Sequence, residues 1–443
     1  MRHLCALFAI PIISLSCSSK QNVTIPDPNL AAVVREALNL DPSDPIPEKK
    51  LKELEELTTY QYNIIDLTGL EKATKLKVLK VSDNKISTLS PIANLTQLTT
   101  LSLSNNPISD IRPIANLRKL THLGLGGCQV SDIRPLIGLT QLQVLSLSKN
   151  PIRDFKPISE LTSLTYLELR ENQIADLEPL TELTQLTKLR LWRNQISNIE
   201  PLTELPNLTE LELDYNPITD ITPLSGMTQL TSLSLNGNQI TNIEPLANLK
   251  QITGLFLGRN QINDITPLTG LTQLKYMGLG GNQINDINPV AKFTQLTSLH
   301  LHKNRISNIE PLASLAKLAR LDLSENQISS IEPLVDLVQL TRLYLHINQI
   351  SDIAPLAELT DLKEVNFEGN QIHDISPIAE ATKIHFLYLE RNQISDISIV
   401  ENFTSLRRLF IGDNPIQDME PLQKLLKQIP DLGLDISLPP AIK

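Results

Sequence analysis

Cysteine is scarce in this sequence, which bears on how the chain can be cross-linked. Its 443 residues include three cysteines, at positions 5, 17 and 128. None of the three has a plausible disulfide partner in the sequence, so no disulfide or redox framework can be inferred.

Basic runs are absent as well. The formal net charge is −10, from 39 lysines and arginines against 49 acidic residues, and no stretch is rich in lysine or arginine. Proteins that bind nucleic acid use clustered basic side chains to neutralise phosphates. We therefore expect no nucleic-acid partner for this chain.

The sequence also lacks the signatures of common active sites. It contains no serine–histidine–acid grouping, no phosphate-binding loop and no dinucleotide fingerprint. His300 and His302 have a metal-like spacing, with His346 two strands further on and about 10 Å away. Because no carboxylate completes this set, we expect no metal, no cofactor and no enzymatic activity.

What the chain does contain is a strict repeat of 22 residues, marked by an asparagine. This asparagine recurs at positions 84, 106, 150, 172, 194, 216, 238, 260, 282, 304, 326, 348, 370, 392 and 414, and Cys128 stands once in its place. Sixteen units begin at residue 76 and run to about residue 423 (the range 76–423) without insertion or deletion. In each unit two residues such as Leu101 and Leu103 alternate with polar residues, which predicts a short strand with one buried face.

The other positions of the unit predict a turn and a hydrogen-bonded ladder. Counting from the first leucine of each unit, the asparagine is at position 9, where the chain leaves the strand. Its amide can both donate to and accept from loop backbone groups. Cys128 has only a weak S–H donor, so we expect a local defect that costs about 1–3 kcal/mol. Proline occupies position 16 in fifteen of the sixteen units, and it suits the first position of a helical turn.

A fixed period of this length is typical of a solenoid, and its pattern is that of a leucine-rich repeat. We predict an α/β solenoid shaped as a horseshoe. A parallel β-sheet should line its concave side, with short 3₁₀ or helical turns on the convex side and a helical cap at the N-terminus. Because a solenoid grows in one dimension, a single core can extend through every unit, so the length does not imply several domains.

The N-terminal residues predict export and a cap. Residues 1–17 look like a secretory signal, because the apolar run after Arg2 is too short to span a bilayer. The signal ends in Leu-Ser-Cys, which resembles a bacterial lipobox and makes Cys17 the candidate for lipidation. Plain secretion with a free N-terminus and an uncleaved apolar start are the alternatives. Residues 18–26 are expected to form a tether, and residues 27–53 a helical cap that Asp27 opens as the capping residue.

Both ends of the repeat array depart from the strict register. Residues 54–75 form a degenerate first repeat, and residues 424–443 a C-terminal cap that shields the end of the core. We expect a longer helix over 422–428 and a last strand around Leu434, shifted by one residue from the register.

Three stretches resemble the bacterial internalins. They are Ile-Pro-Asp-Pro-Asn-Leu at 25–30, the degenerate unit at 64–70, and the recurring Asn-Gln-Ile-x-Asp-Ile-x-Pro-Leu. The resemblance implies a small helical cap followed by 22-residue repeats, with a concave face that binds a host or partner protein. No immunoglobulin-like domain, cell-wall sorting motif or second apolar anchor follows the repeats, so membrane attachment is expected only through a lipid on Cys17.

Positions 3, 5, 7 and 8 of each unit point away from the predicted core and are free to bind a partner. Nine of the sixteen aromatic residues in the chain occupy them, whereas chance would place fewer than a fifth there. Exposed aromatic side chains on a rigid surface are the usual anchors of a protein interface. The predicted partner-binding residues are Tyr166, Trp192, Tyr215, Phe256, Tyr276, His300, His302, Arg320, Arg342, Tyr344, His346, Phe386, Tyr388 and Phe410.

These residues fall into three zones. In the first, 166–215, Trp192 is either a binding anchor or part of a surface whose charges pair with one another, such as Glu168, Arg190 and Glu212 in one column. In the second, 254–281, Phe256 and Tyr276 stand among glycines that either leave a hollow for a partner or only permit curvature. The third zone, 300–410, is the preferred site, whereas the units over 98–149 present mostly serine and glycine.

We therefore expect a monomeric, non-catalytic protein of the bacterial envelope or exterior that holds a protein partner on its concave sheet. It would be a membrane-anchored lipoprotein, or secreted or periplasmic. The alternative is a structural or carbohydrate-binding envelope protein, in which Trp192 and the tyrosines stack on sugar rings.

Overall fold

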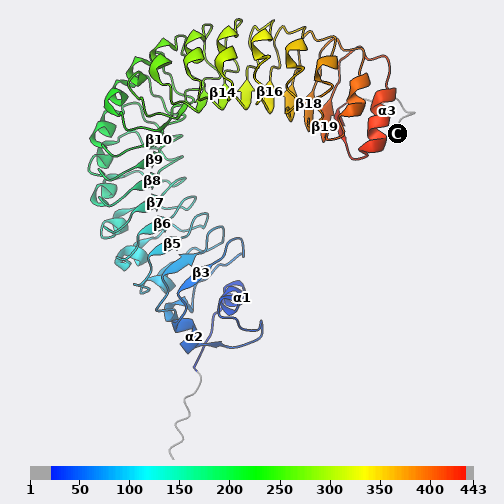
Figure 1. Cartoon of the computed structure of the whole chain (residues 1–443). Coiled ribbons are helices and arrows are strands. Elements are labelled where there is room, and N and C mark those ends of the chain that lie inside the picture. Colours follow the sequence, from blue (N-terminus) through cyan, green and yellow to red (C-terminus); the bar gives the residue numbers. More distant parts are fainter. Residues whose placement is uncertain (1–20, 436–443) are drawn as a thin grey trace, which may run out of the picture.

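The chain forms an open horseshoe, with one short strand of each repeat on the inner curve and one short helical turn on the outer curve (Figure 1). This computed structural model describes residues 21–435. The predicted signal, the candidate lipidation site Cys17 and the last eight residues of the C-terminal cap, 436–443, lie outside the described residues. The predicted solenoid with a concave parallel sheet is confirmed.

The inner sheet consists of eighteen strands, β3 to β20, each paired in parallel with the next. Consecutive leucines stand side by side, as Leu57 does with Leu79 and Leu211 with Leu233. The strands are β1 (Asn22–Val23), β2 (Ile46–Pro47), β3 (Glu56–Thr58), β4 (Val78–Lys80), β5 (Thr100–Ser102), β6 (His122–Gly124), β7 (Val144–Ser146), β8 (Tyr166–Glu168), β9 (Lys188–Arg190), β10 (Glu210–Glu212), β11 (Ser232–Ser234), β12 (Gly254–Phe256), β13 (Tyr276–Gly278), β14 (Ser298–His300), β15 (Arg320–Asp322), β16 (Arg342–Tyr344), β17 (Glu364–Asn366), β18 (Phe386–Tyr388), β19 (Arg408–Phe410) and β20 (Gly433–Asp435).

Short 3₁₀ helices cover the outer curve, and α-helices are found at the two ends. The α-helices are α1 (Pro28–Ala37), α2 (Glu48–Lys52) and α3 (Glu420–Gln428). The 3₁₀ helices are Leu70–Lys72, Ser90–Ile92, Arg112–Asn116, Arg134–Leu136, Lys156–Glu160, Glu178–Leu180, Glu200–Glu204, Thr222–Gly226, Glu244–Leu246, Thr266–Gly270, Asn288–Lys292, Glu310–Ser314, Glu332–Leu334, Ala354–Leu356, Ser376–Ile378 and Ser398–Asn402. All but the first and last of these contain the repeat proline near their start, as its fixed φ favours.

A single hydrophobic core runs the length of the arc between these two layers. It is built from the inward leucines of each strand and the isoleucines of each loop, such as Leu233, Leu235, Ile240 and Ile243, which are almost completely buried. Every unit repeats the same contacts, so each strand is fixed at the same depth and angle as its neighbours. The core thus holds the outward side chains of the strands on a rigid curved surface.

The repeat asparagines form the predicted ladder. Asn238 is typical: its Nδ2 donates to the carbonyl oxygens of Leu235 (2.9 Å) and Leu213 (3.1 Å). Its Oδ1 accepts from the Ile218 N–H of the preceding unit at 3.3 Å. Each amide therefore joins two consecutive loops whose backbone groups are out of reach of water.

Cys128 interrupts the ladder, as expected. Its Sγ lies 3.5 Å from the Leu103 carbonyl oxygen, so the donor contact survives in weakened form. In the other units the asparagine Oδ1 accepts from a backbone N–H of the preceding unit, but Cys128 has no such contact within the described part of the chain. The corresponding N–H, that of Ile108, bonds instead to the Asn106 carbonyl oxygen at 2.8 Å. Burial also raises the pKa of the Cys128 thiol, which keeps it neutral and a weak donor.

The N-terminal end is more ordered than predicted. Residues 22–23 of the expected tether form β1, which pairs antiparallel with β2, and Ile25 is buried. A tether over 18–26 is therefore wrong for these residues, because the β1–β2 pair ties them to the helical segment. Asp27 accepts from the backbone N–H groups of Asn29 and Leu30 at the start of α1. Its second oxygen accepts from Ile65 and Asp66, which joins the cap to the first repeat.

The C-terminal end also differs from expectation. The helix α3 begins at Glu420, two residues before the predicted start at 422, and buries Leu422 and Leu425. The last strand is offset by three residues rather than one, because Leu434 pairs with Leu409 across 25 residues in place of 22. A nine-residue α-helix replaces the usual 3₁₀ turn of three or five residues, and it takes up the additional chain.

Within residues 21–435, no helix combines the length and the apolar character needed to cross a membrane.

Candidate binding surface on the concave sheet

All fourteen predicted partner-binding residues lie outside the core. Tyr215, Tyr276 and Arg342 are exposed, and the other eleven are partly buried. Alternation explains the placement of the strand residues, since those on either side of an inward leucine must point to the opposite face. Tyr215 follows β10 and turns outward through a left-handed backbone conformation, with φ of 53°. The surface is therefore a continuous curved sheet face on which the aromatic rings are held at fixed spacing.

In the first zone, an arginine lies between two aromatic rings. The Arg193 guanidinium is 4.8 Å from the centre of the Trp192 ring and 5.7 Å from that of Tyr215. The two rings are 6.4 Å apart and inclined at 57°. Tyr215 also lies over Gly237, where an added Cβ would come within 2.5 Å of the ring. Cation–π contacts thus occupy much of the ring surface around Trp192.

The charges of the first zone pair with one another, which is one of the two predicted alternatives. Glu212 contacts Arg190 at 3.2 Å and Arg170 at 3.3 Å. Glu168 pairs with Arg170 at 3.0 Å rather than with Arg190, its neighbour in the column. Burial raises the pKa of Glu212, although the two arginines oppose this. The charged part of this zone is therefore satisfied within the chain, and partly exposed pairs of this kind contribute little to stability.

In the second zone, the glycines do not leave a hollow. An added Cβ on Gly278 would meet the Phe256 ring at 3.2 Å, and one on Gly280 would meet the His302 ring at 2.2 Å. Rings from the neighbouring strands therefore already occupy the space above these two glycines. The prediction of a hollow for a partner side chain is wrong there, because a side chain of the protein itself fills it.

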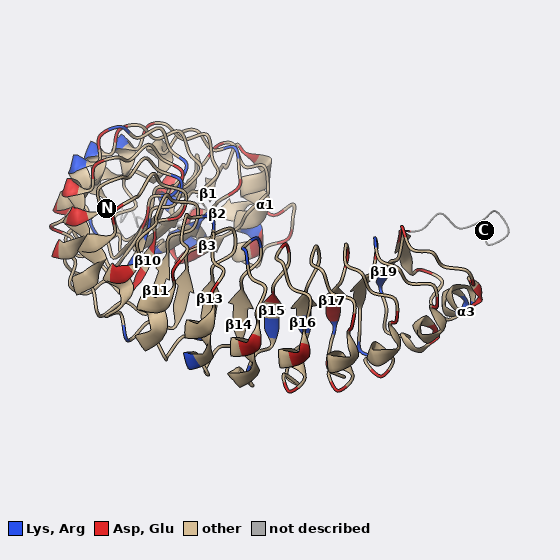
Figure 2. Ribbon diagram, turned by 90° about the horizontal axis from the view of Figure 1, so that it is seen from above, with Lys and Arg blue, Asp and Glu red and all other residues tan. Residues whose placement is uncertain are grey.

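The third zone contains an aromatic stack and a row of charges. Tyr388 on β18 and Phe410 on β19 are direct partners in the sheet, and their rings lie 4.7 Å apart at an angle of 7°. Arg320, Arg342 and Glu364 occupy the same position on β15, β16 and β17 (Figure 2).

The charged groups of this zone are unequally paired. Arg342 contacts Glu364 at 3.5 Å. Among the described residues, no carboxylate oxygen lies within 4 Å of the Arg320 guanidinium. Burial and a hydrogen bond with Glu364 raise the pKa of Tyr344, so its hydroxyl stays protonated at neutral pH.

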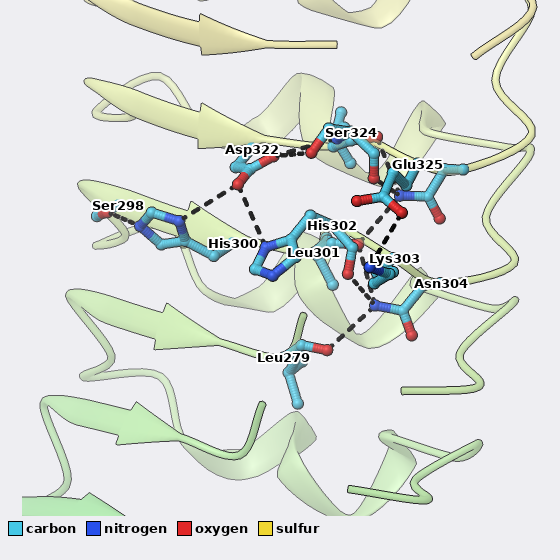
Figure 3. Close-up of polar contacts among 12 residues, drawn as sticks. Leu279, Ser298, His300, Leu301, His302, Lys303, Asn304, Asp322, Ser324 and Glu325 are labelled. Atoms are coloured by element: carbon cyan, nitrogen blue, oxygen red, sulfur yellow. Dashed lines mark hydrogen bonds and ion pairs between the residues drawn. The ribbon is translucent and has the colours of Figure 1, made fainter. Parts of the chain in front are cut away.

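The structure corrects the expectation that no carboxylate completes the histidine pair. Asp322 on β15 is the direct partner of His300 on β14. Its Oδ2 lies 3.2 Å from His302 Nδ1 and 3.9 Å from His300 Nδ1 (Figure 3). His346 is not part of this group. Adding one repeat length to residue 300 would have identified Asp322 from the sequence.

Sequence reasoning also missed exposed residues in the degenerate first repeat. Tyr60 is 66% exposed, and Tyr62 and Ile65 are exposed beside it. All three lie in the degenerate unit 54–75, before the first complete repeat. Extending the register backwards by one unit places Tyr60 at position 7, so this signal was present in the sequence.

Comparison with known proteins agrees with the repeat pattern. The family model described as leucine-rich repeats in two copies matches twelve segments between residues 74 and 424: 74–116, 96–138, 118–161, 140–182, 162–205, 184–226, 228–270, 272–314, 294–336, 316–358, 338–380 and 382–424. No curated protein matches the chain in sequence.

Solved structures of bacterial and plant proteins have the same fold. An internalin of Listeria monocytogenes, InlF, is 31% identical with a TM-score of 0.57, and the match covers 84% of this chain and 96% of that one. The functional domain of InlJ from the same organism, described as including a cysteine ladder, is 25% identical with a TM-score of 0.63 over 80% of this chain and 83% of that one. A plant peptide hormone receptor, solved in complex with RGF2, is 21% identical with a TM-score of 0.56 over 82% of this chain and 71% of that one, and it shows the fold alone. The continuous repeats and the likeness to InlF over nearly its whole length show that this chain is a leucine-rich repeat protein of the internalin-like family.

Proposed function

We propose that this chain is a non-catalytic binding protein that holds a protein partner on the third zone of its concave sheet. The observation that carries the proposal is the group of partly exposed rings formed by Tyr344 on β16, Phe386 and Tyr388 on β18, and Phe410 on β19. Rings of this kind bury a large area when a partner covers them, and they lose little conformational freedom in doing so.

The rigidity of the sheet supports this assignment. Tyr344, Tyr388 and Phe410 each extend from a strand residue whose two neighbours in the chain are buried, so binding requires no rearrangement of the backbone. Arg320, which has no carboxylate partner among the described residues, is available to pair with an acidic group. A partner segment that presents apolar side chains beside a carboxylate fits this zone.

Related folds are consistent with such a role. The plant receptor, which has the same fold, is solved in complex with RGF2, and this chain has leucine-rich repeats between residues 74 and 424. Sugar stacking at Trp192, the alternative function, is less well supported because Arg193 lies 4.8 Å above that ring.

A photo-crosslinking amino acid at Asn366 tests the proposal directly. Asn366 stands between Tyr344 and Tyr388 in the sheet, so a partner on the third zone must pass over it. We expect crosslinking to one protein when the chain is incubated with extracts of cell-surface proteins. Replacing Tyr344 and Tyr388 with alanine should weaken binding of that protein by about 30-fold or more, the effect of losing one interface hot spot of about 2 kcal/mol.

Matched positions supply the controls. Ser102 is the equivalent residue on β5, among the units that present mostly serine, and a crosslinker there should capture nothing. A parallel binding assay on a glycan array tests the carbohydrate alternative with Trp192→Ala. Crosslinking at Ser102 as strong as at Asn366, or full affinity in the double alanine variant, would place the partner elsewhere.

We further propose that the protein is exported and anchored through a lipid on Cys17, as the lipobox-like sequence suggests. A Cys17→Ser substitution should move the protein from the membrane fraction to the soluble fraction when cells expressing the full chain are fractionated. Cys5→Ser, a change within the same signal, is the control and should leave the distribution as it is. Membrane retention of Cys17→Ser would contradict lipid anchoring.

A further inference from the structure

His300, His302 and Asp322 form a compact group on the concave sheet. Their ligand atoms all lie within 4.8 Å of one another, and the two contacts of Asp322 Oδ2 measure 3.2 and 3.9 Å. In a tetrahedral zinc site with bonds of about 2.0–2.1 Å, ligand atoms are about 3.3–3.4 Å apart. Small rotations of the His300 and His302 side chains therefore bring all three atoms to coordination distance.

Neighbouring groups orient each of these side chains (Figure 3). His300 Nε2 is 3.0 Å from Ser298 Oγ, so an Nε2–H that donates to this hydroxyl leaves Nδ1 as a free lone pair facing Asp322. The backbone N–H and the hydroxyl of Ser324 both donate to Asp322 Oδ1, which leaves Oδ2 directed at the imidazoles. Metal sites use such outer contacts to fix the tautomer and the direction of their ligands.

The position of His302 depends on a glycine. Its ring fills the space over Gly280, where an added Cβ would come within 2.2 Å of Cε1. His302 Nδ1 is buried and, Asp322 aside, has no polar partner in the described part of the chain. The nearby ammonium of Lys303 is directed to Glu325 at 3.2 Å and does not compete for Asp322.

From this arrangement we infer that His300, His302 and Asp322 bind one zinc ion on the concave face. Two imidazoles and one carboxylate are a known ligand set for zinc, and they leave the fourth position for water or for a donor atom of a bound molecule. The side chains of the two histidines are 30% and 37% exposed, so an ion can reach the site from solvent. The inference does not rest on the proposed protein partner, because all three ligands come from this chain.

The test is a titration of the untagged full chain with zinc sulfate after dialysis against a chelator. Calorimetry should show one equivalent bound in the micromolar range or tighter, and cobalt(II) should give the visible absorption of a tetrahedral site with nitrogen and oxygen ligands. His302→Ala and Asp322→Asn should each abolish this binding. Ser298→Ala should weaken it by about 10–100-fold, as expected for a contact that only orients a ligand.

Three further variants separate loss of the site from loss of the fold. Gly280→Ala displaces the His302 ring without changing a ligand and should also lose the zinc, whereas Gly226→Ala, which meets nothing within 4 Å, should keep it. His346→Ala should keep it too. Absence of saturable binding to the unsubstituted chain up to millimolar zinc would overturn the inference, as would undiminished binding by His302→Ala. Failure of the crosslinking experiment above would leave this result unaffected.

Discussion

Replacing Asn238 with leucine is expected to lower the free energy of unfolding by about 3 kcal/mol or more. The side chain serves three buried backbone groups, the carbonyl oxygens of Leu213 and Leu235 and the N–H of Ile218. Leucine has a similar volume but can satisfy none of them, and each buried polar group left without a partner costs about 1–3 kcal/mol. Because Asn238 joins two loops, the effect should extend to both units.

Urea denaturation, followed by far-ultraviolet circular dichroism, measures this effect. Asn248→Leu is the matched control: Asn248 is exposed in the same repeat and should change stability by less than about 0.5 kcal/mol. The reciprocal variant Cys128→Asn should gain about 1 kcal/mol, since an amide N–H would replace the weak S–H contact with the Leu103 carbonyl oxygen. An Asn238→Leu protein as stable as the parent would show that the ladder is not a major source of stability.

Asp27→Ala is expected to detach the N-terminal cap, at a cost of about 2–4 kcal/mol. The Asp27 carboxylate accepts from four backbone N–H groups, two at the start of α1 and two in the first repeat, at 2.7–3.1 Å. No other side chain of the described cap bonds to both segments in this way. Its loss should therefore release α1 and uncover the apolar edge of the solenoid.

The same carboxylate should make the cap sensitive to acid. Burial raises the pKa of Asp27, but the four backbone donors outweigh it and hold the pKa below the usual value. A lowered folded pKa means that the stabilisation is complete above the unfolded pKa of about 4 and is lost as the pH falls through the folded pKa. Asp27→Ala should therefore remove part of the stability at neutral pH and flatten its loss in acid.

Hydrogen exchange of residues 28–53, measured by mass spectrometry at pH 7, reports on the cap alone. Exchange should become fast in Asp27→Ala and stay slow in Asp41→Ala, a control at an exposed aspartate of the same cap. Unchanged protection in Asp27→Ala would mean that apolar packing alone holds the cap.

The sequence predicted the structural features that recur in every repeat unit. A fixed period of 22 residues specifies the strand, the asparagine turn and the proline-led turn in every unit, because identical units bury identical surfaces only when they stack in register. The same periodicity places nine aromatic residues on the concave face. Periodicity does not predict the structure of the two ends, because these segments do not follow the repeat. There, Asn22–Val23 pairs with Ile46–Pro47, and Leu434 pairs with Leu409.

The sequence by itself determined the solenoid, the ladder and the face available for binding, since these follow from periodicity and from which residues avoid water. The tertiary structure alone decided which side chains on that face meet: Arg170 with Glu168, the His302 ring over Gly280, and Asp322 beside two histidines. Register brings such residues to neighbouring strands, but rotamers and local crowding select the contact. Those choices depend on distances of a few ångströms that no spacing along the chain can specify.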